Sequence, residues 1–463
     1  MAIRTNSPQA RDIAYHLHPY TNAEVHEKIG PRIITGGDGI YVIDDDGKRY
    51  IEGLAGLWCT ALGFSEKRLA DAAYKQMQEL PYYHGFAHAT TPPVIELAER
   101  LVELAPPSIS KVFFTNSGSE ANDSLIKMIW YYNNALGRPE KKKIISRRQA
   151  YHGVTVASSS MTALAYVQNS FDLPIANFIY TDCPHYWRYC EDGESEEEFS
   201  TRMADNLEKL ILDEGPETIA AFFAEPVQGA GGVVVPPTGY FEKIQAVVRR
   251  YDVLFVADEV ICGFARTGNM FGCDTFGIEP DMMSVAKALS SAYLPIAGSM
   301  ISDEIYQAIK AESGRLGVFG TGYTYSGHPV PAAVALETLT ISEERDILGH
   351  VRGIAPRFLE RLHGFMDHPL IGETRGVGLI GAVQMVPDKT KNQVFDPTLK
   401  VGLAAVRYMA EHGLITRALP GDAIAFCPPL IITESQIDDM FDSLAAALDD
   451  VLDDLTRQGA MAA

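Results

Sequence analysis

Two ionisable side chains stand directly after apolar runs of strand length. Asp258 follows Val253–Ala257, and Lys287 follows Met282–Ala286. Their separation, 287 − 258 = 29 residues, is about one strand–helix–strand unit, which would place an acid and an amine at neighbouring strand ends. Taken singly, Asp258 has a simpler explanation as a turn acid, and Lys287 as a surface charge at a helix end. The pair is more informative than either residue.

A third apolar run ends in small residues. Lys111–Phe114 leads into Thr115–Ser119, and a helix is expected to begin near Ser119. Small residues allow close backbone approach, and the free amides at a helix N-terminus attract phosphate. A serine that caps the helix also explains this segment. It matches neither a nucleotide phosphate loop nor a dinucleotide-binding turn.

These three features together match the needs of one cofactor. An amine can form a Schiff base, a carboxylate can hold a pyridinium ring protonated, and a cradle of small residues can bind a phosphate. The combination therefore predicts pyridoxal 5'-phosphate as the cofactor.

The elements that must position these residues are expected to form a parallel sheet. Short, near-continuous apolar runs separated by helix-length segments are typical of strands covered by helices on both faces. In such sheets, ligands bind at the carboxyl ends of the strands. The runs that end in polar or glycine-rich turns are Lys111–Phe114, Ile219–Ala224, Val253–Ala257 and Met282–Ala286.

The flanking segments show simpler patterns. Residues 1 to about 35 are mixed and polar, and we expect an arm that packs on another part of the protein. Residues 41–51 predict a hairpin around Asp46-Gly47. Residues 92–104 have apolar side chains at helical spacing and a proline in the first turn. An amphipathic helix with a Thr433/Gln436 capping box is expected to close the chain. The acidic run 191–198 is expected to be a solvated loop or a helix entrance.

Composition excludes several classes of function. The 463 residues include 39 basic and 60 acidic side chains, a formal charge of −21, which disfavours nucleic acid as a partner. Hydrophobic residues make up 46% of the chain, enough for a large core. The sequence predicts neither a bilayer-spanning segment nor a signal peptide, so we expect a cytoplasmic protein. The six cysteines lack C-x-x-C spacing, and His16/His18 and His363/His368 show no paired-ligand motif, so no metal site is predicted.

The chain resembles the class III, or ω-amino acid, aminotransferases, which are fold type I pyridoxal enzymes. The likeness extends over nearly the whole length. The Gly56–Trp58 element, together with Cys427–Pro429, is most similar to the branch that uses pyruvate and ω-amines, including polyamine–pyruvate enzymes. The segments that carry the resemblance are Gly56–Trp58, Thr115–Asp123, Ala150–Gly153, Ala224–Gly229, Asp258–Phe264 and Tyr323–Pro329.

The resemblance implies an α/β fold of two parts. A large, doubly wound domain with a mostly parallel sheet would bind the cofactor and span residues 66–330. A small α+β domain would be built from both termini, from residues 1–65 together with the arm and from residues 331–463.

Cofactor roles carry over by position. Lys287 resembles the Schiff-base lysine that also moves the proton between cofactor and substrate, and Asp258 resembles the partner of the pyridinium nitrogen. Tyr151 and Val260 correspond to the contacts on the two ring faces. The remaining cofactor residues implied are Ser117, Gly118 and Ser119 at the phosphate, His152, Glu225, and Thr324, which would reach the phosphate from the other subunit of a homodimer.

Substrate roles carry over in the same way. Arg417 resembles the arginine that binds the keto acid carboxylate and moves aside for an amine that has none, with Glu225 near it. Trp58 and Phe86 resemble pocket walls. Tyr20 would come from the arm of the partner subunit, and Tyr151 would also face the substrate. Alanines replace the glycines that the family commonly has at positions 265 and 288.

The function implied is a ping-pong transamination. An ω-amine or diamine would give its amino group to a keto acid, expected to be pyruvate, which would become alanine. A decarboxylase or aminomutase on the same scaffold is the first alternative, and a cofactor-binding protein without turnover is the second. Small-molecule substrates and a second copy of the chain are the expected partners, with no nucleic acid and no membrane.

Overall fold

The central sheet has seven strands in the order β4-β10-β9-β8-β7-β5-β6. The structure is a computed structural model, and it describes residues 6–461. Strands β5 to β9 pair in parallel, and β10 runs antiparallel to both β4 and β9. The predicted mostly parallel sheet is therefore confirmed. Its strands are β4 Ile109–Thr115, β5 Lys143–Arg147, β6 Phe178–Thr181, β7 Ile219–Ala224, β8 Leu254–Asp258, β9 Met282–Val285 and β10 Ala297–Ser302.

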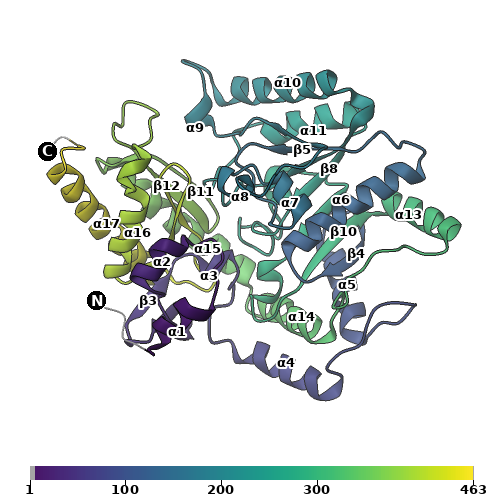
Figure 1. Cartoon of the computed structure of the whole chain (residues 1–463), viewed down its shortest axis with the longest axis horizontal. Coiled ribbons are helices and arrows are strands. Elements are labelled where there is room, and N and C mark those ends of the chain that lie inside the picture. Colours follow the sequence, from purple (N-terminus) through teal and green to yellow (C-terminus); the bar gives the residue numbers. More distant parts are fainter. Residues whose placement is uncertain (1–5, 462–463) are drawn as a thin grey trace.

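Both faces of this sheet are buried, which explains its continuous apolar runs. Alternate residues of β7 enter different cores, because successive side chains of a strand point to opposite faces. Phe222 packs in a core with residues of α10 and α11, whereas Phe223 packs in another with residues of α6 and α13. Figure 1 shows these helix pairs flanking the sheet. The helices are α6 Gly118–Ala135, α10 Glu196–Glu214, α11 Tyr240–Arg250 and α13 Asp303–Leu316.

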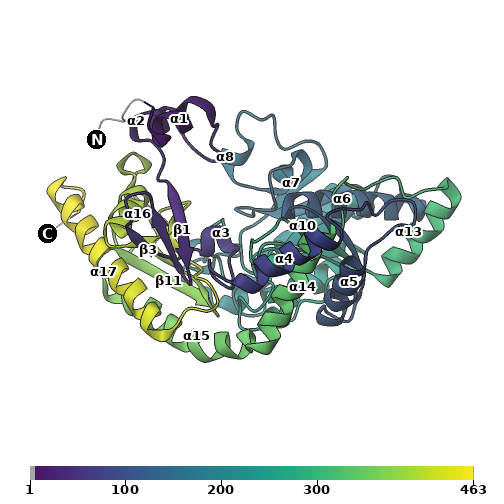
Figure 2. The same cartoon turned by 90° about the horizontal axis from the view of Figure 1, so that it is seen from below.

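Two smaller sheets lie beside the large one. Strand β13 pairs in parallel with β3, so segments from both ends of the chain share one sheet. Both termini accordingly lie on the same side of the molecule in Figures 1 and 2. The domain boundaries near residues 65 and 330 stay a prediction. The strands are β1 Ile34–Asp38, β2 Tyr41–Asp44, β3 Arg49–Glu52 and β13 Leu414–Ile415 in one sheet, and β11 Ile371–Val377, β12 Ile380–Met385, β14 Arg417–Leu419 and β15 Ala423–Phe426 in the other.

The local predictions hold. The hairpin of β2 and β3 turns at Gly47, whose φ of +80° suits glycine. Helix α5 spans Pro92–Leu104, and α17 spans Glu434–Arg457 behind the Thr433/Gln436 capping box. The acidic run leads into α10, where Ser195 and Glu198 form a second capping box.

The remaining helices connect the sheets. None of the described helices is both long and apolar enough to cross a membrane. In Figure 2, α4 and α5 lie beside α14, and α1 and α2 form the arm. These helices are α1 Pro8–Tyr15, α2 Ala23–Ile29, α3 Ala55–Trp58, α4 Lys67–Glu79, α7 Val156–Met161, α8 Ala165–Gln168, α9 Tyr186–Tyr189, α12 Gly272–Phe276, α14 Pro329–Glu344, α15 Ile347–His363 and α16 Val401–Glu411.

Candidate active site

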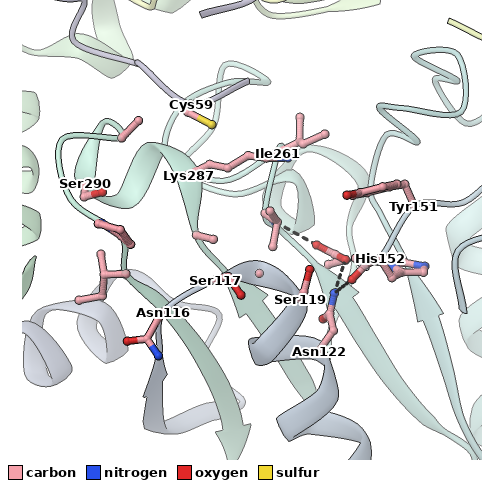
Figure 3. Close-up of a pocket in the computed structure, with 18 of the residues that line it drawn as sticks. Cys59, Asn116, Ser117, Ser119, Asn122, Tyr151, His152, Ile261, Lys287 and Ser290 are labelled. Carbon is pink, nitrogen blue, oxygen red and sulfur yellow. Dashed lines mark hydrogen bonds and ion pairs between the residues drawn. The ribbon is translucent and has the colours of Figure 1, made fainter. Parts of the chain in front are cut away.

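The carboxyl ends of three strands meet around one cavity of about 320 Å³. Asp258 is the last residue of β8, and it lies opposite Ser284 of the neighbouring strand β9. Lys287 follows β9 by two residues, and Ser117 follows β4. Figure 3 shows Lys287 and Tyr151 on opposite sides of this pocket. The predicted cofactor residues that line it are Ser117, Gly118, Ser119, Tyr151, His152, Glu225, Asp258, Val260 and Lys287.

Asp258 is held in a buried hydrogen-bond network. Its Oδ2 lies 2.8 Å from Nδ1 of His152 and accepts a 2.8 Å bond from the Asn122 amide. Burial alone would raise the pKa of Asp258, but these hydrogen bonds and the nearby imidazole lower it below its ordinary value. The carboxylate therefore stays ionised in the core, where it can hold a partner cation.

The Lys287 side chain is free to react. Within residues 6–461, its ammonium group forms no hydrogen bond and no ion pair. The backbone of Lys287 has a φ of +51°, a left-handed conformation that a residue with a side chain rarely adopts. The turn after β9 thus directs a lysine without a fixed partner into the pocket, as Schiff-base chemistry requires.

The start of α6 has the features of the phosphate-binding segment that we predicted from its small residues. Ser117 caps the helix by accepting the Glu120 amide at 3.2 Å, so the capping explanation is also correct. The amides of Gly118 and Ser119, in the first helical turn, have no carbonyl one turn earlier to bind. A Cβ on Gly118 would lie 3.1 and 3.2 Å from the two Val260 methyls, so a side chain there would crowd the pocket.

Glu225 does not pair with Arg417, contrary to our expectation. The carboxylate of Glu225 accepts bonds from the Tyr151 amide at 3.0 Å and the Gly229 amide at 2.9 Å. Burial raises its pKa. Both carboxylate oxygens are taken up by the backbone, so Glu225 shapes the loop that carries Tyr151.

Tyr20 reaches the site from its own chain, which corrects the expectation of a partner arm. Its hydroxyl donates to the Tyr151 hydroxyl at 3.2 Å. The guanidinium of Arg417 lies over the Tyr20 ring, 5.8 Å from the ring centre, and Tyr166 packs edge-on against Tyr20. The arm therefore places Tyr20 on Tyr151, beside Arg417 of β14 and Tyr166 of α8.

Three other predicted residues do not line this pocket. Trp58 is buried in a core with Leu54 and Val227. Phe86 is 46% exposed and lines a second cavity together with residues 318–322. Thr324 is exposed, and its carbonyl accepts a bond from Tyr82. Within one chain, Trp58 and Phe86 do not line the cofactor pocket, and their role as walls of the substrate pocket stays a prediction.

Asn122 and Cys59 are among the pocket residues that the sequence prediction did not include. Asn122 joins Asp258 to the backbone carbonyl of His152, which it binds at 2.7 Å. It lies one helical turn after Gly118, on the same face of α6, and this spacing was the available signal. Cys59, beside Trp58, lines the cavity near Lys287 and offered no such pattern.

The geometry defines a class of protein. A buried, ionised carboxylate, an unpaired lysine and a helix N-terminus surround one cavity at the carboxyl edge of a mostly parallel sheet, as in pyridoxal enzymes of fold type I. A model of the class-III aminotransferases matches residues 22–448. The chain therefore belongs to the class III aminotransferase family.

Curated relatives and solved structures of similar proteins agree with this family assignment. A chloroplastic gamma aminobutyrate transaminase 3 from Solanum lycopersicum is 51% identical over 94% of this chain and 84% of its own length. The omega transaminase from Pseudomonas jessenii, solved with pyridoxamine phosphate (PMP), is 54% identical with a TM-score of 0.95, covering 96% of this chain and 98% of that one. An engineered variant of a thermostable omega transaminase is 53% identical with a TM-score of 0.95, over 96% and 99%.

The residues present fit the family's cofactor, pyridoxal 5'-phosphate. A Cβ on Gly118 would crowd the Val260 side chain, and the same cavity is lined by the ring of Tyr151 and by Lys287, Asp258, Ser117 and Ser119, which supply the amine, the acid and the phosphate-binding residues that this cofactor needs. Nε2 of His152 is buried without a hydrogen-bond partner among the described residues, behind Asp258. When bound, this cofactor supplies an aldehyde for the lysine and a protonated ring that withdraws electrons. The protein is thus a pyridoxal-phosphate-dependent aminotransferase.

Proposed function

We propose that this enzyme transfers the amino group of an ω-amine to pyruvate, which becomes alanine, by a ping-pong mechanism. The observation that carries the proposal is the position of Arg417. Its guanidinium lies over the ring of Tyr20, whose hydroxyl bonds that of Tyr151 in the pocket, and it forms no ion pair or hydrogen bond within residues 6–461. A guanidinium without a partner can bind a carboxylate through two parallel hydrogen bonds, and it can also move aside.

The reacting residues have separate tasks in this proposal. Lys287 would bind the cofactor covalently and, once displaced by the substrate amine, its neutral Nζ would take the proton from the substrate carbon and pass it to the cofactor carbon C4′. Asp258, held by His152 and Asn122, keeps a proton on the ring nitrogen. Negative charge would build up on the ring only when the proton leaves the substrate carbon. The Asp258 carboxylate therefore stabilises the transition state more than it stabilises the bound amine. Ser117, Gly118 and Ser119 bind the phosphate.

The donor class has two candidates. Similar solved structures are described as omega transaminases, one of them substituted at a Trp, a Phe and an Arg for the synthesis of bulky amines. Several curated relatives are named gamma-aminobutyrate transaminases, one of them 48% identical over 97% of its own length. We therefore place γ-aminobutyrate beside diamines as a donor. In both, the reacting amine sits at the end of an unbranched chain.

We further propose a homodimer with shared active sites. Phe86 and Thr324 lie on an exposed surface, where Gly322 packs so closely on Phe86 that a Cβ would come within 2.5 Å of the ring. A second copy that covers this surface would receive Thr324 at its phosphate and Phe86 at its substrate. The cytoplasmic location stays a prediction, since curated relatives include mitochondrial and chloroplastic proteins.

A donor panel tests the proposal. The holoenzyme would be incubated with pyruvate and either γ-aminobutyrate, putrescine, β-alanine or an aryl amine, and alanine would be measured by mass spectrometry. We expect stoichiometric alanine from at least one ω-amine, with the donor converted to its aldehyde or ketone. Release of carbon dioxide, or an isomer of the donor without alanine, would instead indicate a decarboxylase or an aminomutase. Consumption of the amine only when another keto acid replaces pyruvate, with the matching amino acid formed and no alanine, would refute pyruvate as the acceptor.

A further inference from the structure

Three histidines of the N-terminal arm surround a single carboxylate. Nδ1 of His16 lies 3.1 Å from Oδ1 of Asp12, and Nε2 of His18 lies 2.7 Å from Oδ2. Nε2 of His26, on α2, lies 3.0 Å from the same Oδ2. The ring centres of His16 and His18 are 4.2 Å apart, and those of His18 and His26 are 4.3 Å apart. Segments from two helices and the link between them thus bring four side chains to one point.

The donor atoms converge as metal ligands do. One ligand atom each from Asp12, His16 and His18 lies within 4.8 Å of the other two. In a tetrahedral zinc site, bonds of about 2.0–2.1 Å separate neighbouring donors by roughly 3.3 Å. The spacings of 2.7 and 3.1 Å between the oxygens of Asp12 and the nitrogens of His18 and His16 lie within 1 Å of this value.

The chemistry of the set selects the cation. Two imidazoles and one carboxylate are the ligands of many zinc sites, whereas calcium and magnesium prefer oxygen donors. His26 and Asp12 are already hydrogen-bonded, and such second contacts orient a ligand and raise affinity. The side chains of Asp12 and His18 are 21% and 25% exposed and that of His16 is 59% exposed, so a cation can reach the site from solvent.

We propose that Asp12, His16 and His18 bind one divalent zinc-class cation per chain, with water at the fourth position and His26 orienting Asp12. Each coordinating imidazole gives the cation a nitrogen lone pair, and the proton that this nitrogen carried toward Asp12 leaves to solvent or to the other ring nitrogen. No electron is transferred.

The proposed cation site lies close in sequence to Tyr20, which contacts the cofactor pocket. His18 is two residues before Tyr20, whose hydroxyl bonds Tyr151 in the cofactor pocket. Helices α1 and α2 contain no buried residue, so little apolar packing holds the arm. Figure 2 shows α1 and α2 side by side at the edge of the molecule, and His26 of α2 contacts Asp12 of α1. A cation that joins the end of α1 to the following link would fix the arm and therefore Tyr20.

Zinc binding by the tag-free holoenzyme tests the proposal. After dialysis against a chelator, Zn²⁺ would be titrated calorimetrically, and bound metal would be counted by elemental analysis. We expect one Zn²⁺ per chain in the wild type and an affinity at least about 100-fold lower in His16→Asn/His18→Asn, since two ligands are lost. His26→Asn should weaken binding by about 10-fold, as for loss of an orienting contact.

A matched control separates this site from scattered surface binding. His412 also lies 2.7 Å from a carboxylate, that of Asp450, but has no second imidazole there. His412→Asn should bind Zn²⁺ as the wild type does. Equal stoichiometry and affinity in the wild type and the double variant would overturn the proposal. Hydrogen exchange of the wild type gives a test that needs no variant to fold. If Zn²⁺ does not slow exchange over residues 8–29, the proposal is also overturned.

Discussion

Nδ1 of His152 lies 2.8 Å from Oδ2 of Asp258, and both side chains are almost completely buried. Since the carboxylate accepts, this nitrogen carries the proton. The Asn122 amide binds the same oxygen, so two donors hold a single acid at the end of β8. Such a network keeps the acid ionised away from water and fixes its direction, the two properties that a partner for a ring nitrogen needs.

Replacing Asp258 tests this role. Asp258→Asn should keep the fold and bind cofactor but lower kcat by at least about 100-fold, because a neutral amide cannot hold the ring proton by charge, a loss of several kcal/mol in a buried site. Single-turnover kinetics with saturating amine measures it. Asp281→Asn, at the opposite edge of the same sheet, is the control and should react at the wild-type rate. A wild-type rate in Asp258→Asn would refute the assignment.

Replacing Lys287 separates binding from chemistry. Lys287→Ala should retain cofactor through the phosphate cradle but lose the covalent link and nearly all turnover. After borohydride reduction, intact mass spectrometry should find the cofactor attached to the wild type. It should find no attached cofactor in Lys287→Ala. Lys310→Ala, on the exposed face of α13, should behave as the wild type. Full activity in the Lys287 variant would show that another amine reacts.

The Arg417 side chain should matter for one half of the reaction. Arg417→Ala is expected to weaken pyruvate binding by roughly 2–4 kcal/mol, the scale of a charge-assisted bidentate contact in a partly buried site. The half-reaction with a carboxylate-free amine should change far less. Stopped-flow measurement of each half-reaction checks this, with the exposed Arg407→Ala as control. Equal losses in both halves at unchanged cofactor content would contradict a carboxylate-binding role.

A buried acid next to the site gives a pH dependence of stability. Burial raises the pKa of Glu259 to about 7, even though the Gly272 and Cys273 amides bind its carboxylate. Because the folded pKa lies above the ordinary value of 4.5, the stabilising contribution is complete below about pH 4.5 and is lost as the pH rises through 7.

The variant Glu259→Gln removes this titration. Its deficit in unfolding free energy relative to the wild type should shrink by up to about 3 kcal/mol between pH 5 and pH 8. Thermal melting at both pH values measures the change. Exposed Glu242→Gln should follow the wild type throughout. A deficit that is the same at both pH values would mean that Glu259 is ionised over the whole range.

Much of this protein follows from local sequence. Continuous apolar runs predicted strands buried on both faces, because a strand covered by helices has no polar side, and β7 divides its phenylalanines between two cores for that reason. The polar residue that ends each run was expected at the carboxyl edge, where Asp258 and Lys287 indeed meet. Helix caps such as Ser117 and Thr433 could be predicted because a cap depends on residues only three positions apart.

What the sequence could not determine depends on contacts between distant segments. No spacing rule indicated that Tyr20 lies on Tyr151 of its own chain, 131 residues later, or that Glu225 turns to backbone amides and not to Arg417. The three histidines of the arm looked unrelated because His26 joins the others only when α2 folds back beside α1. Side-chain partners across such distances are selected by packing and by the need to satisfy buried polar groups, and only the tertiary structure specifies them.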